Sequence, residues 1–343
     1  MVIRYIRKKV DLQTGAVTER TRARYEAAIS RFGIFLAFVG LGASFSQFST
    51  SEYAKDPFAV DSLVASYLQM LYDMDFPRHY GRDLLTVLPK RLLNLRRHLT
   101  ASWGAMNVWE RMEPPRRAEP IGLDHVLLLM FHVFSCCSFS FNSNCLDLVS
   151  LAVCFGIMFH CMLRPSEAFN IRRCDVVFNL ASASITLNHT KTSTRKNARE
   201  FVSVEDPFVV LVLRLYCSAF DAAGFSESCC LFDFADSFTE LLVTISTSCG
   251  LAILGLQPYS FRRGGATFDF EVFRSFDRLC ERGRWLHQKN ARIYIEDAVA
   301  ARARQKVDTL TREALKEARI CLAFFALKLG MCGNSLFLSQ TRQ

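Results

Sequence analysis

Residues 258 to 294 contain side chains whose types and spacing could handle a phosphate group. The stretch Pro-Tyr-Ser-Phe-Arg-Arg-Gly-Gly-Ala-Thr at 258–267 is followed by Gly-Arg-Trp at 283–285 and then by Tyr294, which we expect to lie in a helix. Arginine presents a planar fork of donors to phosphate oxygens, and a tyrosine hydroxyl can serve as a nucleophile. The motifs therefore predict a phosphate-handling site, and we expect its substrate to be a nucleic-acid backbone.

A further arginine motif, Arg164-Pro165-Ser166-Glu167, precedes this region. Proline disfavours helical geometry at the residue before it and suits the first turn of a helix, so we expect Arg164 at a helix entrance. Helix N-termini attract phosphates, and a guanidinium there adds a bidentate clamp. Glu167 would stabilise the same turn and hold the arginine side chain. Taken alone, the motif is more typical of an ordinary surface cap.

Lys191 lies between two alternating apolar runs, one with Ile185 and Leu187 and the other at 201–204, which together predict a β-hairpin. From the tip of a hairpin, a flexible ammonium can reach over a groove and donate a proton to a leaving oxygen. A solvated loop lysine is the simpler interpretation of this residue alone.

Arg262 could bind one phosphate oxygen while Arg164 binds another, which would stabilise the extra charge of a pentacoordinate transition state. The glycines at 264 and 265 permit a close backbone approach. On one unbroken helix, Trp285 and Tyr294 would lie on opposite faces, so both could face one site only if a turn intervenes. The polar stretch 286–290 can supply that turn. The alternative is that both are ordinary core aromatics.

Residues 17–110, which precede these motifs, have the periodicity of a small helical bundle, with apolar residues at three- and four-residue steps. Its first and last helices carry several arginines and lysines. A solvated face is the usual interpretation of one such helix, but two of them before a phosphate-handling region favour DNA. The predicted DNA contacts are Arg20, Arg24, Lys90, Arg91, Arg96 and Arg97 in this bundle, and Arg195, Lys196 and Arg263 beyond it.

The boundaries follow from the proline content. Three prolines between Met112 and Pro120 rule out a continuing helix and predict an extended linker. We therefore expect a helical DNA-binding domain at 1–112, a linker at 113–122, a mainly helical second domain with a β-hairpin at 123–303, and a helical tail at 304–343. The tail would cover its own core or dock on a neighbour.

Composition narrows the class of protein. Among 343 residues, 42 Lys and Arg against 33 Asp and Glu give a net charge of +9, which favours an acidic partner. The hydrophobic content of 50% excludes a mainly disordered chain. None of the 13 cysteines has Cys-x-x-Cys spacing, so we expect reduced, intracellular core thiols and no metal site.

The apolar stretches 123–141 and 146–163 contain His and Asp, which favours buried helices over membrane spans. The first nine residues contain no apolar run long enough for a secretory signal, so we do not expect export.

Taken together, the candidate residues resemble the active-site set of the tyrosine recombinases, also called the phage integrase family. They are Arg164, Lys191, Tyr259-x-x-Arg262, Trp285 and Tyr294. In that family an arginine followed by Ser-Glu, a hairpin lysine, His-x-x-Arg, a His or Trp and a tyrosine nucleophile occur in this order. The resemblance covers about residues 145 to 300. The N-terminal bundle resembles the family's core-binding domain in helical character and basic charge only.

The resemblance implies a mainly α fold with a small β-hairpin or sheet, in which a helical core-binding domain and a catalytic domain clamp double-stranded DNA. Tyr294 would attack a scissile phosphate to give a 3′-phosphotyrosyl link and a free 5′-hydroxyl, with no metal and no other cofactor. Arg164 and Arg262 would hold the non-bridging oxygens, and Lys191 would protonate the leaving oxygen. Trp285 would pack on the phosphate and Glu167 would support Arg164. The working form on DNA would be a homo-oligomer, a tetramer.

Tyr259 departs from the family, which usually has histidine at this position. A phenol is a poorer proton shuttle than an imidazole at neutral pH, so an impaired enzyme or a domesticated DNA-binding protein that retains the fold is an alternative. The Arg-Arg-Gly-Gly-Ala-Thr and Gly-Arg-Trp signatures resemble those of eukaryotic mobile-element recombinases, which implies a nuclear setting. The same residues could also belong to a type IB topoisomerase, or to a helical interaction protein whose motif residues do not converge in space.

Overall fold

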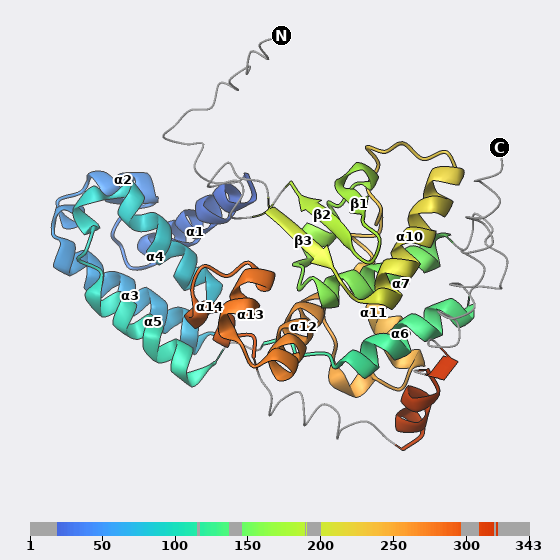
Figure 1. Cartoon of the computed structure of the whole chain (residues 1–343). Coiled ribbons are helices and arrows are strands. Elements are labelled where there is room, and N and C mark those ends of the chain that lie inside the picture. The colour runs from blue at the N-terminus through green and yellow to red at the C-terminus, as the bar shows by residue number, and fades with distance from the viewer. Residues whose placement is uncertain are drawn as a thin grey trace, which may run out of the picture. The chain divides into compact units, whose positions relative to one another are not determined.

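The computed structural model describes residues 19–114, 117–136, 146–188, 190, 200–295, 309–318 and 320–321. The chain divides into two compact units, an N-terminal unit at Met1–Arg116 and a C-terminal unit at Arg117–Gln343 (Figure 1). Each unit has a hydrophobic core of its own.

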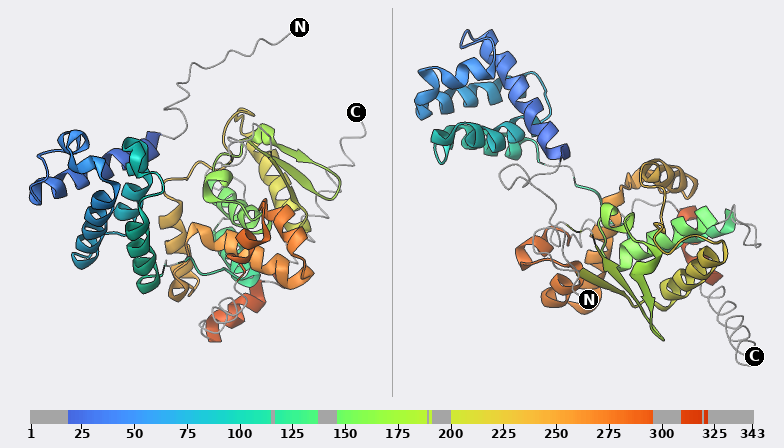
Figure 2. Two further views of the ribbon diagram at one scale, coloured as in Figure 1. Left: turned by 90° about the vertical axis from the view of Figure 1, so that its left-hand side faces the viewer. Right: turned by 90° about the horizontal axis from the view of Figure 1, so that it is seen from above.

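The N-terminal unit is a bundle of helices, as the periodicity predicted. Its elements are α1 (Glu19–Phe38), α2 (Phe45–Thr50), η1 (Tyr53–Lys55), α3 (Pro57–Asp73), α4 (His79–Arg91), η2 (Leu93–Leu95) and α5 (Thr100–Met112). Helix α1 packs on α4 and α3 packs on α5 (Figure 2). Phe32, Leu36, Tyr67 and Leu84 are almost fully buried between them and form the centre of this core.

A buried aspartate determines where α5 begins. The residue before the helix, Leu99, offers no side-chain cap. Asp61 of α3 takes that role, because its carboxylate accepts the backbone N–H groups of Ala101 at 2.8 Å and Ser102 at 2.9 Å. Two of the unpaired donors of the first turn are thereby satisfied across the bundle, which fixes α5 to α3.

The C-terminal unit combines helices with one small sheet (Figure 1). Its helices are α6 (Leu123–Cys136), α7 (Leu146–His160), α8 (Pro165–Ala168), η4 (Arg173–Asp175), α10 (Pro207–Ala222), α11 (Phe238–Ser248), η5 (Ala252–Leu254), α12 (Pro258–Phe273), α13 (Phe276–Gly283) and α14 (Gln288–Arg292). Residues 151–159 of α7 are buried on every side, which agrees with the buried helix expected there. Helices α6, α10 and α12 pack around it.

The sheet contains β1 (Val176–Phe178), β2 (Ala183–Leu187) and β3 (Glu200–Val204), in that order and antiparallel. Strands β2 and β3 are the predicted hairpin, with Ile185 opposite Val202. Strand β1 was not predicted, because its three residues are too few to show an alternating pattern.

Two glycines allow α12 to lie against neighbouring backbone. A Cβ atom on Gly264 would lie 2.0 Å from the carbonyl oxygen of Ile121, and one on Gly265 would lie 2.0 Å from that of Phe159 in α7. The close approach that the sequence predicted is therefore made within the C-terminal unit. It sets the position of α12, which carries Arg262.

Part of the tail packs on its own unit. Residues 309–318 are helical, and Ala318 belongs to the same core as α7. The buried thiols Cys154, Cys161 and Cys217 agree with the expectation of core cysteines, but Cys136 and Cys174 are exposed. Across the described ranges, no helix combines the length and apolar character that a membrane crossing requires.

Candidate active site

A buried carboxylate, Glu167, lies at the centre of the candidate site. Helix α8 begins at Pro165, and Glu167 in its first turn accepts the backbone N–H of Arg164 at 2.9 Å. The carboxylate also accepts a hydrogen bond from Arg164 Nη1, and a further one from Arg284 Nη2 at 2.6 Å. Arg262 Nη1 lies 3.9 Å from its Oε2 atom. Three guanidinium groups thus surround one carboxylate whose residue is 4% exposed.

The charges in this cluster shift one another's pKa values. Burial opposes ionisation of Glu167, but Arg284, Arg164 and Arg262 outweigh it and hold the pKa of Glu167 below its ordinary value. Burial also opposes the charge of Arg164, yet the Glu167 carboxylate raises the pKa of Arg164 overall. For Arg262, burial and the nearby Arg164 and Arg284 lower the pKa to about 10. These three groups therefore keep their charges at neutral pH.

Arg262 is fully buried and is held by two backbone carbonyls. Its Nη1 donates to the carbonyl oxygen of Met162, and its Nη2 donates to that of Gly283 at 2.9 Å. The guanidinium carbon lies 4.6 Å from the ring centroid of Trp285 and 5.4 Å from that of Tyr294. Both rings are close enough for a cation–π interaction. Within the described ranges, Nε of Arg262 is buried and has no hydrogen-bond partner.

Trp285 and Tyr294 face each other, as the candidate site requires. Their ring centroids are 4.8 Å apart and the ring planes are tilted by 38°. A bend at 286–287 and the short helix α14 supply the expected turn between them. Tyr294 itself lies in the turn that follows α14, which corrects the prediction that it belongs to a helix. Its carbonyl oxygen accepts a hydrogen bond from Thr267 Oγ1 of α12 at 3.1 Å.

The open side of the cluster is formed by Arg164 and Tyr259. The Arg164 side chain is 23% exposed, and Tyr259, in the first turn of α12, is 45% exposed. Tyr259 and Tyr294 both lie close enough to interact electrostatically with Arg164. The structure thus brings together Arg164, Glu167, Arg262, Trp285 and Tyr294, with Tyr259 at the edge. This convergence argues against accidental motif matches.

Three predicted site residues lie outside the described residues: Lys191, Arg195 and Lys196. They belong to the segment between β2 and β3, so their part in the site stays a prediction. Arg263 has a different outcome. It is 5% exposed, so its place in the interior does not favour the DNA contact expected of it.

The structure adds Arg284, which sequence reasoning had not assigned to the site. Its side chain is 8% exposed and is shared between Glu167 and Glu200. The one sequence signal is its position in the Gly-Arg-Trp motif at 283–285, from which only Trp285 was assigned to the site. A buried arginine cannot be distinguished from a surface arginine at that position without the fold.

In the N-terminal unit, the predicted DNA-binding residues Arg20, Arg24, Lys90, Arg91, Arg96 and Arg97 are all exposed or partly exposed. Some already have partners. Arg24 binds Asp83 through Nε at 3.1 Å and Nη2 at 2.6 Å, and Arg91 forms an ion pair with Glu26. Lys90 lies 4.7 Å from the ring centroid of Tyr25. Arg96 and Arg97 are exposed and form no ion pair with any described residue, so their charges are available to an acidic ligand.

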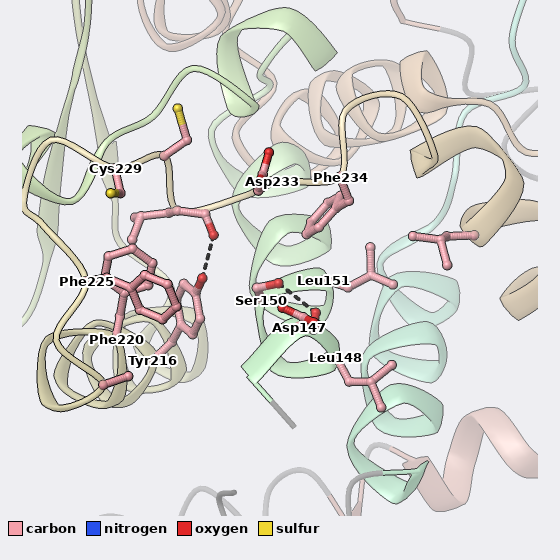
Figure 3. A pocket seen from close by; sticks show the side chains of 14 residues that line it. Asp147, Leu148, Ser150, Leu151, Tyr216, Phe220, Phe225, Cys229, Asp233 and Phe234 are labelled. Carbon is pink, nitrogen blue, oxygen red and sulfur yellow. Dashed lines mark hydrogen bonds between the residues drawn. The ribbon is translucent and has the colours of Figure 1, made fainter. Parts of the chain in front are cut away.

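A separate cavity of about 840 Å³ lies in the C-terminal unit and shares no residue with the arginine cluster (Figure 3). Phe220, Phe225 and Phe234 form much of its apolar wall, and the Tyr216 hydroxyl at its side donates to the Leu231 carbonyl. The part of the chain that the structure describes contains no group of three or more His, Cys, Asp or Glu side chains suited to a metal ion.

Two similar solved structures are both of the XerH site-specific recombinase. Its post-cleavage complex with palindromic difH substrate has a TM-score of 0.50 at 10% identity, over 81% of this chain and 75% of that one. Its pre-cleavage complex with difH substrate has a TM-score of 0.50 at 10% identity, over 80% and 76%. The XerA recombinase has a TM-score of 0.39 at 12% identity, over 83% of this chain and 98% of that one, and is too distant to compare in detail.

No protein-family model and no curated protein matches the sequence. The likeness to XerH concerns the fold, and the chain has the mainly helical, two-domain fold of the tyrosine recombinases.

Proposed function

We propose that this protein is a site-specific DNA recombinase that cleaves and rejoins strands through a 3′-phosphotyrosyl intermediate. The observation that carries the proposal is one cluster, in a fold shared with the DNA-bound XerH recombinase. In it Arg164 and Arg262 lie beside the buried Glu167 carboxylate, and the rings of Trp285 and Tyr294 lie over the Arg262 guanidinium. The positive charge of the cluster suits a phosphodiester, and the phenol beside it can act as the nucleophile.

In the proposed reaction, the Tyr294 oxygen attacks the phosphorus atom and forms a new P–O bond. The bond from phosphorus to the 5′-oxygen breaks, Lys191 gives that oxygen a proton, and the phenolic proton passes to solvent. Arg164 and Arg262 neutralise the charge that develops on the non-bridging oxygens. Attack by a 5′-hydroxyl on the phosphotyrosyl link reverses these steps and joins a strand. Because Trp285 and Tyr294 lie over Arg262, these rings must move before a phosphate reaches its guanidinium.

We propose that the protein works as a homo-oligomer, a tetramer, on double-stranded DNA. We also propose that it belongs to a mobile element of the eukaryotic type and acts inside the cell, in the nucleus. The signatures at 262–267 and 283–285 support that assignment.

The test is covalent capture from a pool of random-sequence nicked duplexes, which requires no knowledge of the target site. Wild-type protein is incubated with the pool, and DNA that stays attached after denaturation is recovered and sequenced. With Tyr294→Phe, no DNA should stay attached after denaturation. This variant should still bind the DNA captured by wild type with wild-type affinity, because one hydroxyl adds little to a wide electrostatic interface. Tyr72→Phe, which removes an exposed phenol of α3, is the matched control and should behave as wild type.

The same capture decides between the enzyme and a catalytically impaired, domesticated DNA-binding protein. Tyr259, in place of the family's histidine, is the observation that favours the second candidate. Duplex binding without any adduct across the whole pool would replace the recombinase proposal with the DNA-binding one.

A further inference from the structure

Arg284 combines an unusual backbone with a buried charge. Its φ angle is 58°, in the left-handed region that glycine adopts easily and arginine seldom does. It caps the C-terminus of α13, where a glycine is the common choice. Backbone strain of this kind persists where surrounding contacts impose it, and it is frequent at functional sites.

The contacts of Arg284 explain why an arginine stands there. Nη2 donates to Glu167 at 2.6 Å, Nη1 donates to the Cys161 carbonyl at 3.3 Å, and Nε lies 3.4 Å from Glu200 Oε2. One guanidinium therefore connects the end of α7, the first turn of α8 and the start of β3. Glycine at this position would relieve the backbone and lose all three connections.

The charge balance shows what Arg284 does for Arg164. Arg164, Arg262 and Arg284 share Glu167, and Glu200 is the second carboxylate in contact with the group, so one positive charge is in excess. A buried carboxylate left without a partner is strongly unfavourable. Because Arg284 binds Glu167 independently, Arg164 can exchange that carboxylate for another anion and leave Glu167 paired.

We propose that Arg284 is a positioning residue for the phosphate site, one that neutralises Glu167 and thereby frees the Arg164 guanidinium to bind the scissile phosphate. This inference rests on the proposed function. Through Glu200, Arg284 also holds β3, the strand that follows the segment carrying Lys191. Arg284 itself does not touch the reacting atoms; it acts through Glu167 and Glu200.

The experiment uses Arg284→Gly in the full chain, because glycine suits the left-handed backbone and removes the side chain, guanidinium included, without adding backbone strain. On DNA recovered by the capture described above, the single-turnover rate of adduct formation should fall by about ten- to a hundredfold. The Kd for the same duplex should change by less than about threefold, since most affinity comes from phosphate contacts elsewhere. Arg284→Lys should retain more of the rate than Arg284→Gly. Arg111→Ala, which removes one exposed charge from α5, is the control and should keep the wild-type rate.

Chemical rescue separates positioning from a merely structural role. Millimolar guanidinium ion should restore part of the Arg284→Gly rate and leave Arg111→Ala unchanged. A wild-type rate in Arg284→Gly would overturn the proposal. A lowered rate without rescue, together with a lowered Tm, would assign Arg284 to folding alone.

A second measurement tests the positioning role of Arg284 even if wild type forms no adduct and the recombinase proposal fails. Inorganic phosphate should raise the Tm of wild type and of Arg111→Ala above that in chloride of equal ionic strength, by occupying the site beside Arg164. Arg284→Gly should lose this increase. An equal phosphate effect in Arg284→Gly and wild type would refute the positioning role, whatever the chemistry of the protein.

Discussion

Glu167 decides the geometry of the site, although it carries no reacting atom. Its residue is 4% exposed, and every described contact of its carboxylate is with Arg164, Arg262 or Arg284. Buried charges are stable only when they are paired, so the position of one carboxylate fixes three guanidinium groups. Glu167 was predicted to support Arg164, and in the structure its carboxylate also lies beside Arg262 and Arg284.

The role of Glu167 leads to a prediction about acid stability. Its pKa is held below its ordinary value of 4.5, so its contribution to stability is complete above that pH and is lost as the pH falls through the folded-state pKa. Glu167→Gln removes this charge at every pH and leaves only Glu200 to offset the three arginines. We expect a loss of about 3 kcal/mol at neutral pH. The difference between wild type and variant should narrow as the pH falls below 4.5.

Urea unfolding of both proteins across this pH range measures the difference directly. Glu240→Gln, which changes an exposed carboxylate on α11, is the control and should follow wild type throughout. A wild-type to Glu167→Gln difference that stays constant with pH would show that the Glu167 charge does not support the fold.

At the residue scale, residue type and order in the sequence were enough to select Arg164, Arg262, Trp285 and Tyr294. They did not show that Arg263, which was predicted to contact DNA, is buried. Consecutive residues on a helix point about 100° apart, so only one of the two can face Glu167. Which one does so depends on how α12 is rotated against α7, and the pattern of the sequence contains no measure of that rotation.

Helix α12 can lie close to α7 because Gly265 has no side chain, which gives the second prediction. A Cβ on residue 265 would meet the Phe159 carbonyl oxygen at 2.0 Å, and a backbone atom cannot move aside as a flexible side chain can. Gly265→Ala should therefore destabilise the C-terminal unit by about 3 kcal/mol or more.

Gly104→Ala is the matched control for that substitution. Gly104 is exposed on α5, and no described atom lies within 4 Å of the position that a Cβ would take there. Alanine at this position should therefore stabilise the helix by about 0.5–1 kcal/mol. Differential scanning calorimetry distinguishes the two outcomes. If Gly265→Ala is as stable as wild type, the close contact between α12 and α7 does not exist in solution.

At the element scale, periodicity predicted the helical N-terminal bundle and the β2–β3 hairpin, because each has several residues that repeat a pattern. The positions of the short elements came from tertiary contacts. Helix α14 ends at Arg292, and the turn that carries Tyr294 is tied to α12 by Thr267. A hydrogen bond between residues so far apart in the chain has no local signal, so the helix expected at Tyr294 was wrong.

At the scale of the whole molecule, net charge alone does not say which cations are available to DNA. Arg24 and Arg91 are exposed but paired with Asp83 and Glu26, and Arg284 and Arg262 are buried in the cluster. A paired arginine that contacts a phosphate must give up or share its carboxylate. Arg96 and Arg97 are exposed and form no ion pair with any described residue, so they need no such exchange.

This distinction gives the last prediction, on the salt dependence of binding. Each phosphate contact releases condensed counterions, so removal of one contact lowers the slope of log K against log salt by about 1. Arg96→Ala with Arg97→Ala should lower the slope by about 2 and weaken binding to all duplex sequences alike. Arg24→Ala with Arg91→Ala should lower it less, because those arginines are neutralised within the unit. Fluorescence anisotropy with a random duplex from about 50 to 200 mM salt measures both slopes. Equal slopes in the two double variants would mean that the ion pairs with Asp83 and Glu26 open on DNA. A wild-type slope in the Arg96→Ala, Arg97→Ala variant would show that the turn between η2 and α5 does not contact DNA.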